Sequence, residues 1–278
     1  MAFIPSLAIH LDKNANENRT INPQTDLSPV VLQLGKHQEL REVLQKECLN
    51  EGLIVIDYEL YLYDSLGATE VGLQNEFFSS GRLDNLLSCF SGVEALSRAD
   101  SEHFCALVCN DHEEVGSVSA CAASGSFLES VFERIFVSKP LSSVFTRSMF
   151  ISCDNAHAVH PNYKKQHDFW HQPVLNGGLV IKVNAKHRYA TTSLTSSIFK
   201  KICLNADVPV QTFVSRNDLS CGSTIGPTTS ARLGIPTIDV GIPQLAMHSC
   251  RETAGVKDPV YLSKALEKFF NFPHSVSV

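Results

Sequence analysis

The sequence lacks the features that mark membrane, secreted and nucleic-acid-binding proteins. None of its apolar runs approaches the roughly 18 uninterrupted residues of a membrane-spanning helix, and its first residues lack the basic and apolar sections of a secretory signal. No cluster of Lys and Arg occurs, and the formal net charge is -6, so the basic face typical of nucleic-acid binding is missing. We therefore expect a cytoplasmic protein with neither a membrane nor a nucleic acid as partner.

The nine cysteines lack the spacing of a disulfide scaffold or of a thiolate zinc site, because they are scattered and form no Cys-x-x-Cys pair. Most are therefore expected to be small core residues. Cys221, in Ser-Cys-Gly-Ser-Thr, resembles a nucleophile that precedes a helix. We disfavour a cysteine hydrolase, because the acidic residues elsewhere in the chain would then have no purpose.

Apolar residues make up 44% of the 278 residues, which is enough for a sizeable core. Three short runs, residues 103–109, 148–152 and 235–240, are apolar on both faces, as buried strands of a central sheet are. Further strands are predicted at 179–183 and 210–214, and helices at 84–96, 126–136, 195–204 and 226–233. This alternation predicts an α/β fold with a mixed central sheet flanked by helices over residues 66–278.

Two details of these helices can be predicted. An apolar stripe on the helix at 84–96 contains Leu86, Leu87, Phe90 and Val93. Ser126 begins a sequence of capping-box form, so we expect its hydroxyl to cap the helix at 126–136.

Residues 1–65 have a different pattern. A strand-like opening at 3–11 precedes a polar, Asn-rich stretch at 14–22, and a helical pattern at 38–47 precedes an alternating strand at 53–63. The chain is therefore predicted to contain two unequal regions, 1–65 and 66–278.

Acidic and imidazole side chains recur in four short stretches, which contain Asp84, the pair Glu113 and Glu114, Asp154, and His248. Two divalent ions need a bridging carboxylate, further oxygen or imidazole ligands, and a free carboxylate that deprotonates their shared water. Taken singly, an Asp after a strand more often caps a helix, and a Glu pair is more often surface charge. Several of these residues follow predicted strands, however, and ligands that leave the carboxyl ends of strands converge on one crevice.

The Glu113-Glu114 pair can supply two different roles. If a turn at a strand end splays the two side chains, Glu114 reaches a metal while Glu113 faces the substrate as general base. No second His follows four residues after His112, which excludes the helical His-Glu-x-x-His zinc signature.

Several motifs are specific in combination. They are Ile4-Pro-Ser-Leu-Ala-Ile-His-Leu-Asp12, Arg82-Leu-Asp-Asn85, Asp111-His-Glu-Glu-Val-Gly-Ser117, Asp154-Asn-Ala-His-Ala-Val-His-Pro-Asn162, Cys221-Gly-Ser-Thr-Ile-Gly-Pro227 and Asp239-Val-Gly-Ile-Pro-Gln-Leu-Ala-Met-His-Ser249. Through them the sequence resembles the M18 family of metalloaminopeptidases, the aspartyl aminopeptidases and their relatives, over nearly its whole length. The resemblance implies a zinc-exopeptidase (phosphorylase/hydrolase-like) sandwich at 66–278, with 1–65 as the remnant of an inserted β-rich oligomerisation domain.

Position by position, the resemblance implies that Asp84 bridges two zinc ions, that Glu114 and His248 complete one of them, and that Asp154 binds the other. Glu113 is then the general base of an aminopeptidase that releases N-terminal residues from peptides. A homo-oligomeric assembly is also implied.

The family carries a further metal-binding His in an N-terminal portion that this sequence does not include. The zinc site at Asp154 is therefore expected to be weakened, because a catalytic zinc normally keeps three protein ligands. His112, His157 and His160 are possible substitutes, and their alternative role is that of imidazoles paired with backbone carbonyls. The alternative function is a truncated, catalytically impaired relic or assembly partner.

Residues that select the substrate are predicted less directly. Lys182 matches the position that contacts an acidic substrate side chain in the family, and Arg188 is a second candidate, whereas His157 and His160 belong to the active-site neighbourhood by resemblance. A cation in the side-chain pocket would favour N-terminal Asp or Glu. The alternative is that the stem of either cation covers apolar surface.

Overall fold

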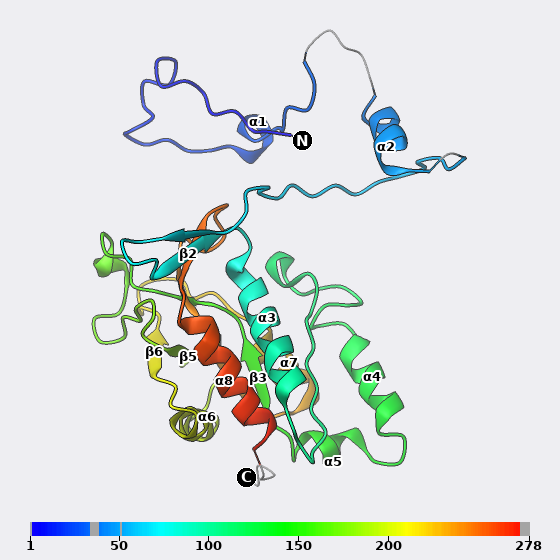
Figure 1. Cartoon of the computed structure of the whole chain (residues 1–278), viewed down its shortest axis with the longest axis vertical. Coiled ribbons are helices and arrows are strands. Elements are labelled where there is room, and N and C mark those ends of the chain that lie inside the picture. The colour runs from blue at the N-terminus through cyan, green and yellow to red at the C-terminus, as the bar shows by residue number, and fades with distance from the viewer. Residues whose placement is uncertain (1, 34–38, 51, 273–278) are drawn as a thin grey trace. The chain divides into compact units, whose positions relative to one another are not determined.

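The computed structural model describes residues 2–33, 39–50 and 52–272, and the chain divides into two units, Met1–Leu62 and Tyr63–Val278 (Figure 1). The first unit holds helices α1 (Pro23–Asp26) and α2 (Leu40–Cys48), and one bridge pairs Phe3 with Val30. None of its described residues is buried.

Within this unit the helix predicted at 38–47 is confirmed by α2 as far as the described residues reach. The strands predicted at 3–11 and 53–63 are wrong, because the described residues there form no strand. An alternating apolar pattern becomes a strand only when its backbone groups pair with a neighbour. Among the described residues, the bridge at Phe3 is the one strand-type pairing that involves these segments.

The second unit is built on two sheets, with strand orders β1-β2-β9-β8-β4 and β3-β7-β5-β6. The strands are β1 (Thr69–Val71), β2 (Phe77–Ser80), β3 (Phe150–Cys153), β4 (Ala156–His157), β5 (Leu179–Val183), β6 (Val210–Val214), β7 (Thr237–Gly241), β8 (Pro243–Leu245) and β9 (Glu252–Gly255). β3 is followed at once by β4, β7 is followed at once by β8, and both pairings are parallel. The two sheets are therefore joined by a pair of parallel chain segments.

Each sheet contains both parallel and antiparallel pairs. β5 pairs parallel with β6 and antiparallel with β7, and β8 pairs parallel with β4 and antiparallel with β9. The predicted mixed sheet is thus confirmed, although the strands are divided between two sheets. The strands at 179–183 and 210–214 agree residue for residue with β5 and β6, and β3 and β7 overlap the predicted runs.

Helices cover both faces of the four-stranded sheet. The helices of this unit are α3 (Leu83–Arg98), α4 (Phe127–Ile135), α5 (Leu141–Phe145), α6 (Ser193–Asn205), α7 (Ile225–Leu233) and α8 (Asp258–Phe270), with short 3-10 helices η1 (Glu113–Val115) and η2 (Lys164–Gln166). Leu179 and Ile181 of β5 share a core with α3, α6 and α8, whereas Val180 between them packs in a second cluster with Tyr189. This is the two-residue period of a strand that is buried on both faces.

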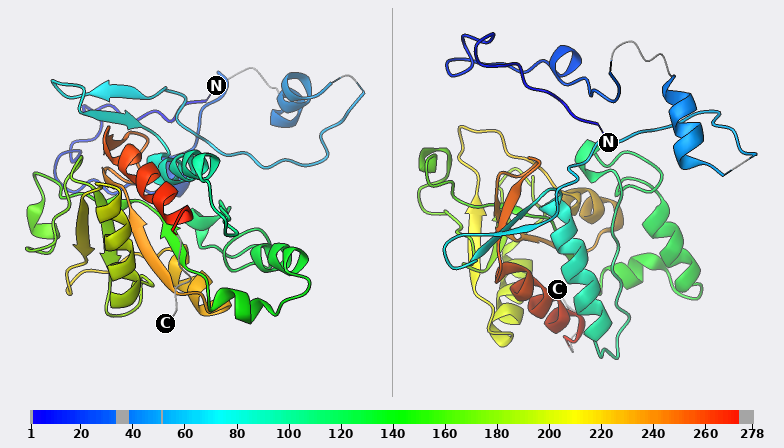
Figure 2. Two further views of the ribbon diagram at one scale, coloured as in Figure 1. Left: turned by 60° about the horizontal axis from the view of Figure 1, so that its bottom comes forward. Right: turned by 45° about the horizontal axis from the view of Figure 1, so that its top comes forward.

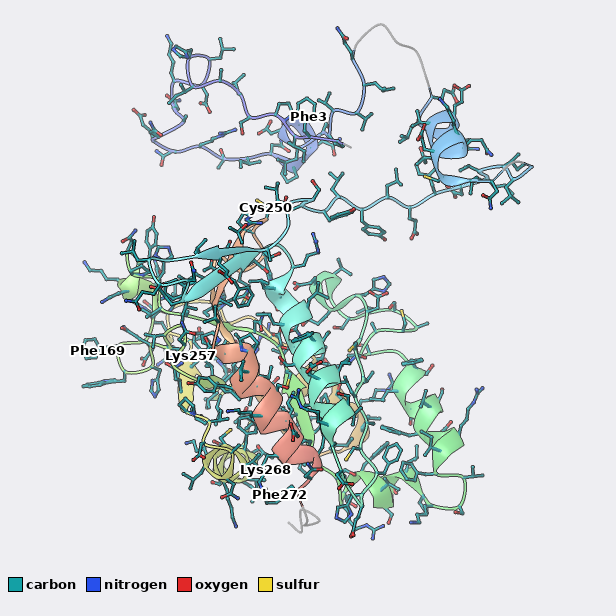
Figure 3. The ribbon with its side chains drawn as sticks, viewed as in Figure 1. Phe3, Phe169, Cys250, Lys257, Lys268 and Phe272 are labelled. Carbon is teal, nitrogen blue, oxygen red and sulfur yellow. The ribbon has the colours of Figure 1, made fainter. Side chains whose placement is uncertain are left out.

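α7 lies on the face opposite to that core. Asp239 of β7 is fully buried and accepts a hydrogen bond from Thr224, which precedes α7. A Cβ on Gly226 would lie 2.4 Å from the Asp239 carboxylate, so only glycine allows α7 to approach β7 this closely. Figure 2 shows α3 and α8 side by side over the sheet, and in Figure 3 Lys257 and Lys268 mark the two ends of α8.

Three expectations for this unit are wrong. Residues 103–109 form no strand. On α3, Leu87 is 9% exposed, but Leu86, Phe90 and Val93 are 57%, 61% and 57% exposed, so most of the predicted stripe is uncovered. Ser126 makes no capping hydrogen bond to α4, because its φ and ψ (-86° and -2°) are helical rather than extended.

Of the helices that the structure describes, none combines the length and apolar content needed to cross a membrane.

The packing of α8 predicts different costs for two truncations on the same helix. Leu262 is 0% exposed in the core, and Val260 is 52% exposed. Leu262→Ala should therefore lower the free energy of unfolding by about 2–5 kcal/mol, because it removes buried methyl groups and leaves a cavity. Val260→Ala should change it by no more than about 0.5 kcal/mol. Urea denaturation of both variants checks this, and equal losses would contradict the described packing.

Candidate active site

Asp84 is positioned by the turn that opens α3. Its backbone N–H donates to Glu252 Oε2 at 2.9 Å, and the side-chain amide of Asn85 donates to the carbonyl of Cys153 at 2.7 Å. These bonds tie the start of α3 to β9 and to the end of β3. The Asp84 side chain is only 3% exposed as a result.

Glu113 and Glu114 lie on η1. The residues on either side, His112 and Gly116, have φ of 59° and 107°, so the chain turns sharply before and after the pair. Consecutive side chains on a 3-10 helix are about 120° apart, so the two carboxylates leave in different directions. The expected splaying therefore arises from a short helix, and not from the end of a strand.

Asp154 follows β3 directly and pairs with a buried cation. Its Oδ2 accepts from Lys182 Nζ at 2.9 Å, and Lys182 also donates to the carbonyl of Asn155 at 3.1 Å. Lys182 is 2% exposed and its ammonium lies 5.3 Å from the centre of the Tyr189 ring. Lys182 is thus held as the counter-charge of Asp154.

His248 lies in the turn between β8 and β9, where Figure 3 labels the nearby Cys250. Its backbone has φ of 67°, and its N–H donates to Glu252 Oε1 at 2.6 Å. The imidazole Nε2 lies 3.2 Å from Asp84 Oδ2 and 3.1 Å from Glu114 Oε2. Three side chains that are far apart in sequence therefore meet at one point.

The Asp84, Glu114 and His248 cluster fits a divalent metal. One ligand atom of each side chain lies within 4.8 Å of the others, and an imidazole with two carboxylates is a ligand set that zinc accepts. Asp84 Oδ1 is buried and has no hydrogen-bond partner within the described part of the chain, whereas Oδ2 faces His248. A carboxylate with one oxygen committed and the other free is suited to bridge two ions.

The electrostatics reflect an excess of carboxylates at this site. The pKa of Asp84 is raised to about 8, first by burial and then by Asp154 and Glu114, while Lys182 lowers it. Burial also raises the pKa of Glu113 to about 7, with Asp154 and Glu114 contributing. The pKa of Glu114 is raised, first by burial, and His248 opposes this.

Glu252 is a site residue that the sequence analysis missed. It is 1% exposed, and its two carboxylate oxygens accept from the backbone N–H groups of Asp84 and His248. It therefore holds the backbone of two of the three clustered residues. The sequence feature that could have identified it is a Glu four residues after His248, in a segment of otherwise small residues. A Glu is rarely buried unless its carboxylate has partners.

The other predicted residues are placed as follows. His157 on β4 packs its ring 5.7 Å from that of Phe213, and its pKa is lowered by burial and then by the charge of Lys182. The ring of His160 lies 4.8 Å from that of Tyr163. Arg188 Nε donates to the carbonyl of Cys221 at 3.2 Å.

His112 is not brought into the cluster. It belongs to a separate exposed group with Asp111 and Cys121. The Nδ1 atom of His112 lies 2.8 Å from the hydroxyl of Ser119. Among the residues that the structure describes, the group that unites predicted ligands is therefore Asp84, Glu114 and His248.

Comparison with known proteins gives a consistent result. A family model described as "Aminopeptidase I zinc metalloprotease (M18)" matches residues 1–270. A protein named "Probable M18 family aminopeptidase 2" from Pseudomonas aeruginosa is 50% identical over 277 residues, which are 97% of this chain and 65% of that protein. The chain therefore spans somewhat less than two thirds of the length of this curated relative.

Two solved structures show the same fold. In the cryo-EM structure of the Ape4 and Nbr1 complex, the matching chain is 39% identical with a TM-score of 0.85, and the match covers 97% of this chain and 57% of that one. The Saccharomyces cerevisiae mApe1 dodecamer matches at 31% identity with a TM-score of 0.69, over 75% of this chain and 49% of that one.

The cluster predicts how metal content depends on its ligands. Glu114→Gln and His248→Ala should each remove most of the bound zinc, because each deletes a ligand atom from the group within 4.8 Å. Asp100→Asn, an exposed carboxylate outside both groups of potential ligands, is the matched control and should leave zinc unchanged. Elemental analysis after dialysis against buffered zinc checks this. Full zinc content in both ligand variants would contradict the assignment.

The position of Glu252 yields a separate prediction. Glu252→Gln replaces one accepting oxygen by an NH₂ group that faces a backbone N–H, so Asp84 or His248 must shift. Zinc affinity should fall by about 10–100-fold, the usual effect of losing a group that orients ligands. Competition with a chelator measures the affinity, and Glu267→Gln, a surface substitution on α8, is the control. An unchanged affinity would show that Glu252 does not position the ligands.

Proposed function

Because the chain belongs to the M18 family of aminopeptidase I zinc metalloproteases, we propose that it hydrolyses the N-terminal peptide bond of peptides with two zinc ions. The observation that carries the proposal is the convergence of Asp84, Glu114 and His248 within 4.8 Å. Glu113 and Asp154 lie close enough for their charges to act on the same group of carboxylates. We propose Asp84 as the bridging ligand, Glu114 and His248 as ligands of one zinc, and Asp154 as a ligand of the other.

Each protein side chain then has a chemical task. Zinc, when bound, would polarise the scissile carbonyl and lower the pKa of its water. Glu113 would take the proton from that water and pass it to the leaving amine. Lys182 would hold the Asp154 carboxylate in place through their 2.9 Å contact.

Preference for acidic N-terminal residues is a finer proposal. It is supported by the positive charge of Lys182, which lies beside Asp154 and is withdrawn from solvent. His157, His160 and Arg188 are proposed to line the surrounding substrate site, with the ring of His157 lying within electrostatic reach of Lys182 and His248.

A catalytically impaired relic is the second candidate. The surroundings of Asp154 favour it. Asp154 forms an ion pair with Lys182, and it belongs to neither of the groups of potential metal ligands among the described residues. Peptides are the proposed substrates in the first case only. In both cases we propose a cytoplasmic chain whose residues 1–65 are the remnant of an oligomerisation domain, in a family whose homo-oligomeric members include the dodecameric mApe1.

The proposed base can be tested apart from the metal. Glu113→Gln should lower kcat for an N-terminal Asp peptide by about 10²–10⁴-fold, because an amide cannot accept the proton, while zinc content stays at the wild-type level. Glu129→Gln, on the surface of α4, is the control for loss of a carboxylate. Release of the N-terminal residue and bound zinc are measured on the same samples. Wild-type turnover by Glu113→Gln would remove the role given to Glu113, and zinc binding without turnover by the wild type would support the relic.

A further inference from the structure

A second group of potential metal ligands lies outside the candidate active site. Among the described residues, one ligand atom each of Asp111, His112 and Cys121 lies within 4.8 Å of the others. Cys121 Sγ is 3.8 Å from His112 Nδ1, and Asp111 Oδ2 is 3.9 Å from His112 Nε2. Neighbouring ligand atoms of a tetrahedral zinc are about 3.3–3.6 Å apart, because the bonds to the ion are about 2.0–2.3 Å long. The three side chains therefore lie close to the spacing that one ion requires.

The loop that carries these side chains is closed by its own backbone. His112 and Ser117 have φ of 59° and 61°, and the N–H of Ser117 donates to the carbonyl of His112 at 2.8 Å. The N–H of Ser124 donates to the carbonyl of Ser117 at 3.2 Å. The chain thus turns back on itself, which returns Cys121 to His112, nine residues earlier in the sequence.

Contacts beyond the ligands fix the backbone that presents Cys121. A Cβ on Gly125 would lie 2.3 Å from the carbonyl oxygens of Ser119 and Ala120, so only glycine allows this close approach. The guanidinium of Arg232, on α7, donates to the carbonyl of Gly125. Because this part of the loop is already held in place, a ligand that binds it has little ordering entropy to overcome.

Hydrogen bonds within the group direct the ligand atoms at one another. Asp111 Oδ1 accepts from the backbone N–H of His112 at 2.8 Å, which leaves Oδ2 on the side of the imidazole. The hydroxyl of Ser119 lies 2.8 Å from His112 Nδ1 and 3.5 Å from Cys121 Sγ. In the described part of the chain, the ion-pair partner of Asp111 is this imidazole and not a Lys or Arg. Its carboxylate is therefore available to a bound cation.

We propose that Asp111, His112 and Cys121 bind one zinc ion, at a site separate from the candidate active site. A thiolate and an imidazole select zinc over magnesium and calcium, which take oxygen ligands. All three side chains are exposed, so water can fill the fourth position. On binding, the thiol proton of Cys121 passes to solvent and the sulfur lone pair forms the bond to the ion.

The position of this site gives it a consequence for the loop. A zinc ion bound by His112 and Cys121 would join the two ends of residues 112–121, which include Glu113 and Glu114. The ion would therefore restrain the segment that carries two residues of the candidate active site, without contacting either of them.

Cobalt(II) titration of the reduced 278-residue chain tests the site. Cobalt substitutes for zinc, and a cobalt–thiolate bond gives a charge-transfer absorption band in the near ultraviolet. The candidate active site has carboxylate and imidazole ligands, so cobalt bound there gives no such band. We expect the band to saturate at one thiolate-bound cobalt per chain and to disappear when zinc is added, because zinc binds more tightly than cobalt.

A matched pair of variants identifies the thiolate. Cys121→Ser should remove the band, whereas Cys109→Ser, which changes an exposed cysteine outside both groups of potential ligands, should retain it. His112→Ala and Asp111→Asn should each raise the cobalt concentration at half-saturation about tenfold or more, because each deletes one of three protein ligands. The melting temperature of each variant without metal shows whether it folds.

Several results would overturn the proposal. These are absence of the band in the folded wild-type chain, a band that Cys121→Ser retains, or a half-saturation that neither His112→Ala nor Asp111→Asn changes, as expected for adventitious binding to a thiol. The band should persist in His248→Ala. Loss of zinc from the candidate active site, or absence of peptide hydrolysis, therefore leaves this measurement unaffected, so the proposed function and this site can fail separately.

Discussion

The carboxylate of Glu252 is the interaction on which the candidate site depends. Its two oxygens hold the backbone N–H groups of Asp84 and His248, which come from opposite ends of the unit's sequence. Glu252 itself is fixed in β9, where it pairs with Ser80 of β2 just before the turn to Asp84. A buried carboxylate is stable only when its oxygens accept hydrogen bonds, so the same two bonds that satisfy Glu252 also bring a carboxylate and an imidazole together.

The site gathers more negative charge than its own cations neutralise. Two like charges about 4 Å apart repel by about 4 kcal/mol at an effective dielectric constant of 20, and Asp84, Glu113, Glu114 and Asp154 act on one another. Lys182 opposes this near Asp154, and His248 opposes it near Glu114. This repulsion adds to burial, the larger cause, in raising the pKa values of Asp84 and Glu113. A divalent cation is the ligand that turns this repulsion into attraction, which is why the cluster suits metal binding better than a structural role.

The elements that could be predicted from the sequence are those that the described residues pack into a core. β5, β6, α6 and α7 match the predicted ranges closely, since each packs in a core that the described residues complete. Asp84, Glu114 and His248 could be chosen because their chemistry and order form a recognisable set. Glu252 could not be found from the same pattern, because it accepts hydrogen bonds from backbone N–H groups. Backbone groups are the same in every residue, so such a role produces no sequence motif.

The failed predictions have one physical cause in common. Residues 53–63, residues 103–109 and the stripe of Leu86, Phe90 and Val93 all have the pattern of surfaces that are covered by protein. A pattern of this kind suits a segment that is covered by other parts of the protein. The segment adopts its regular conformation only when a partner covers it, because an unpaired strand backbone and exposed apolar side chains gain no stability from that conformation. The sequence pattern and the structure therefore disagree at segments that the described residues leave unpaired or exposed.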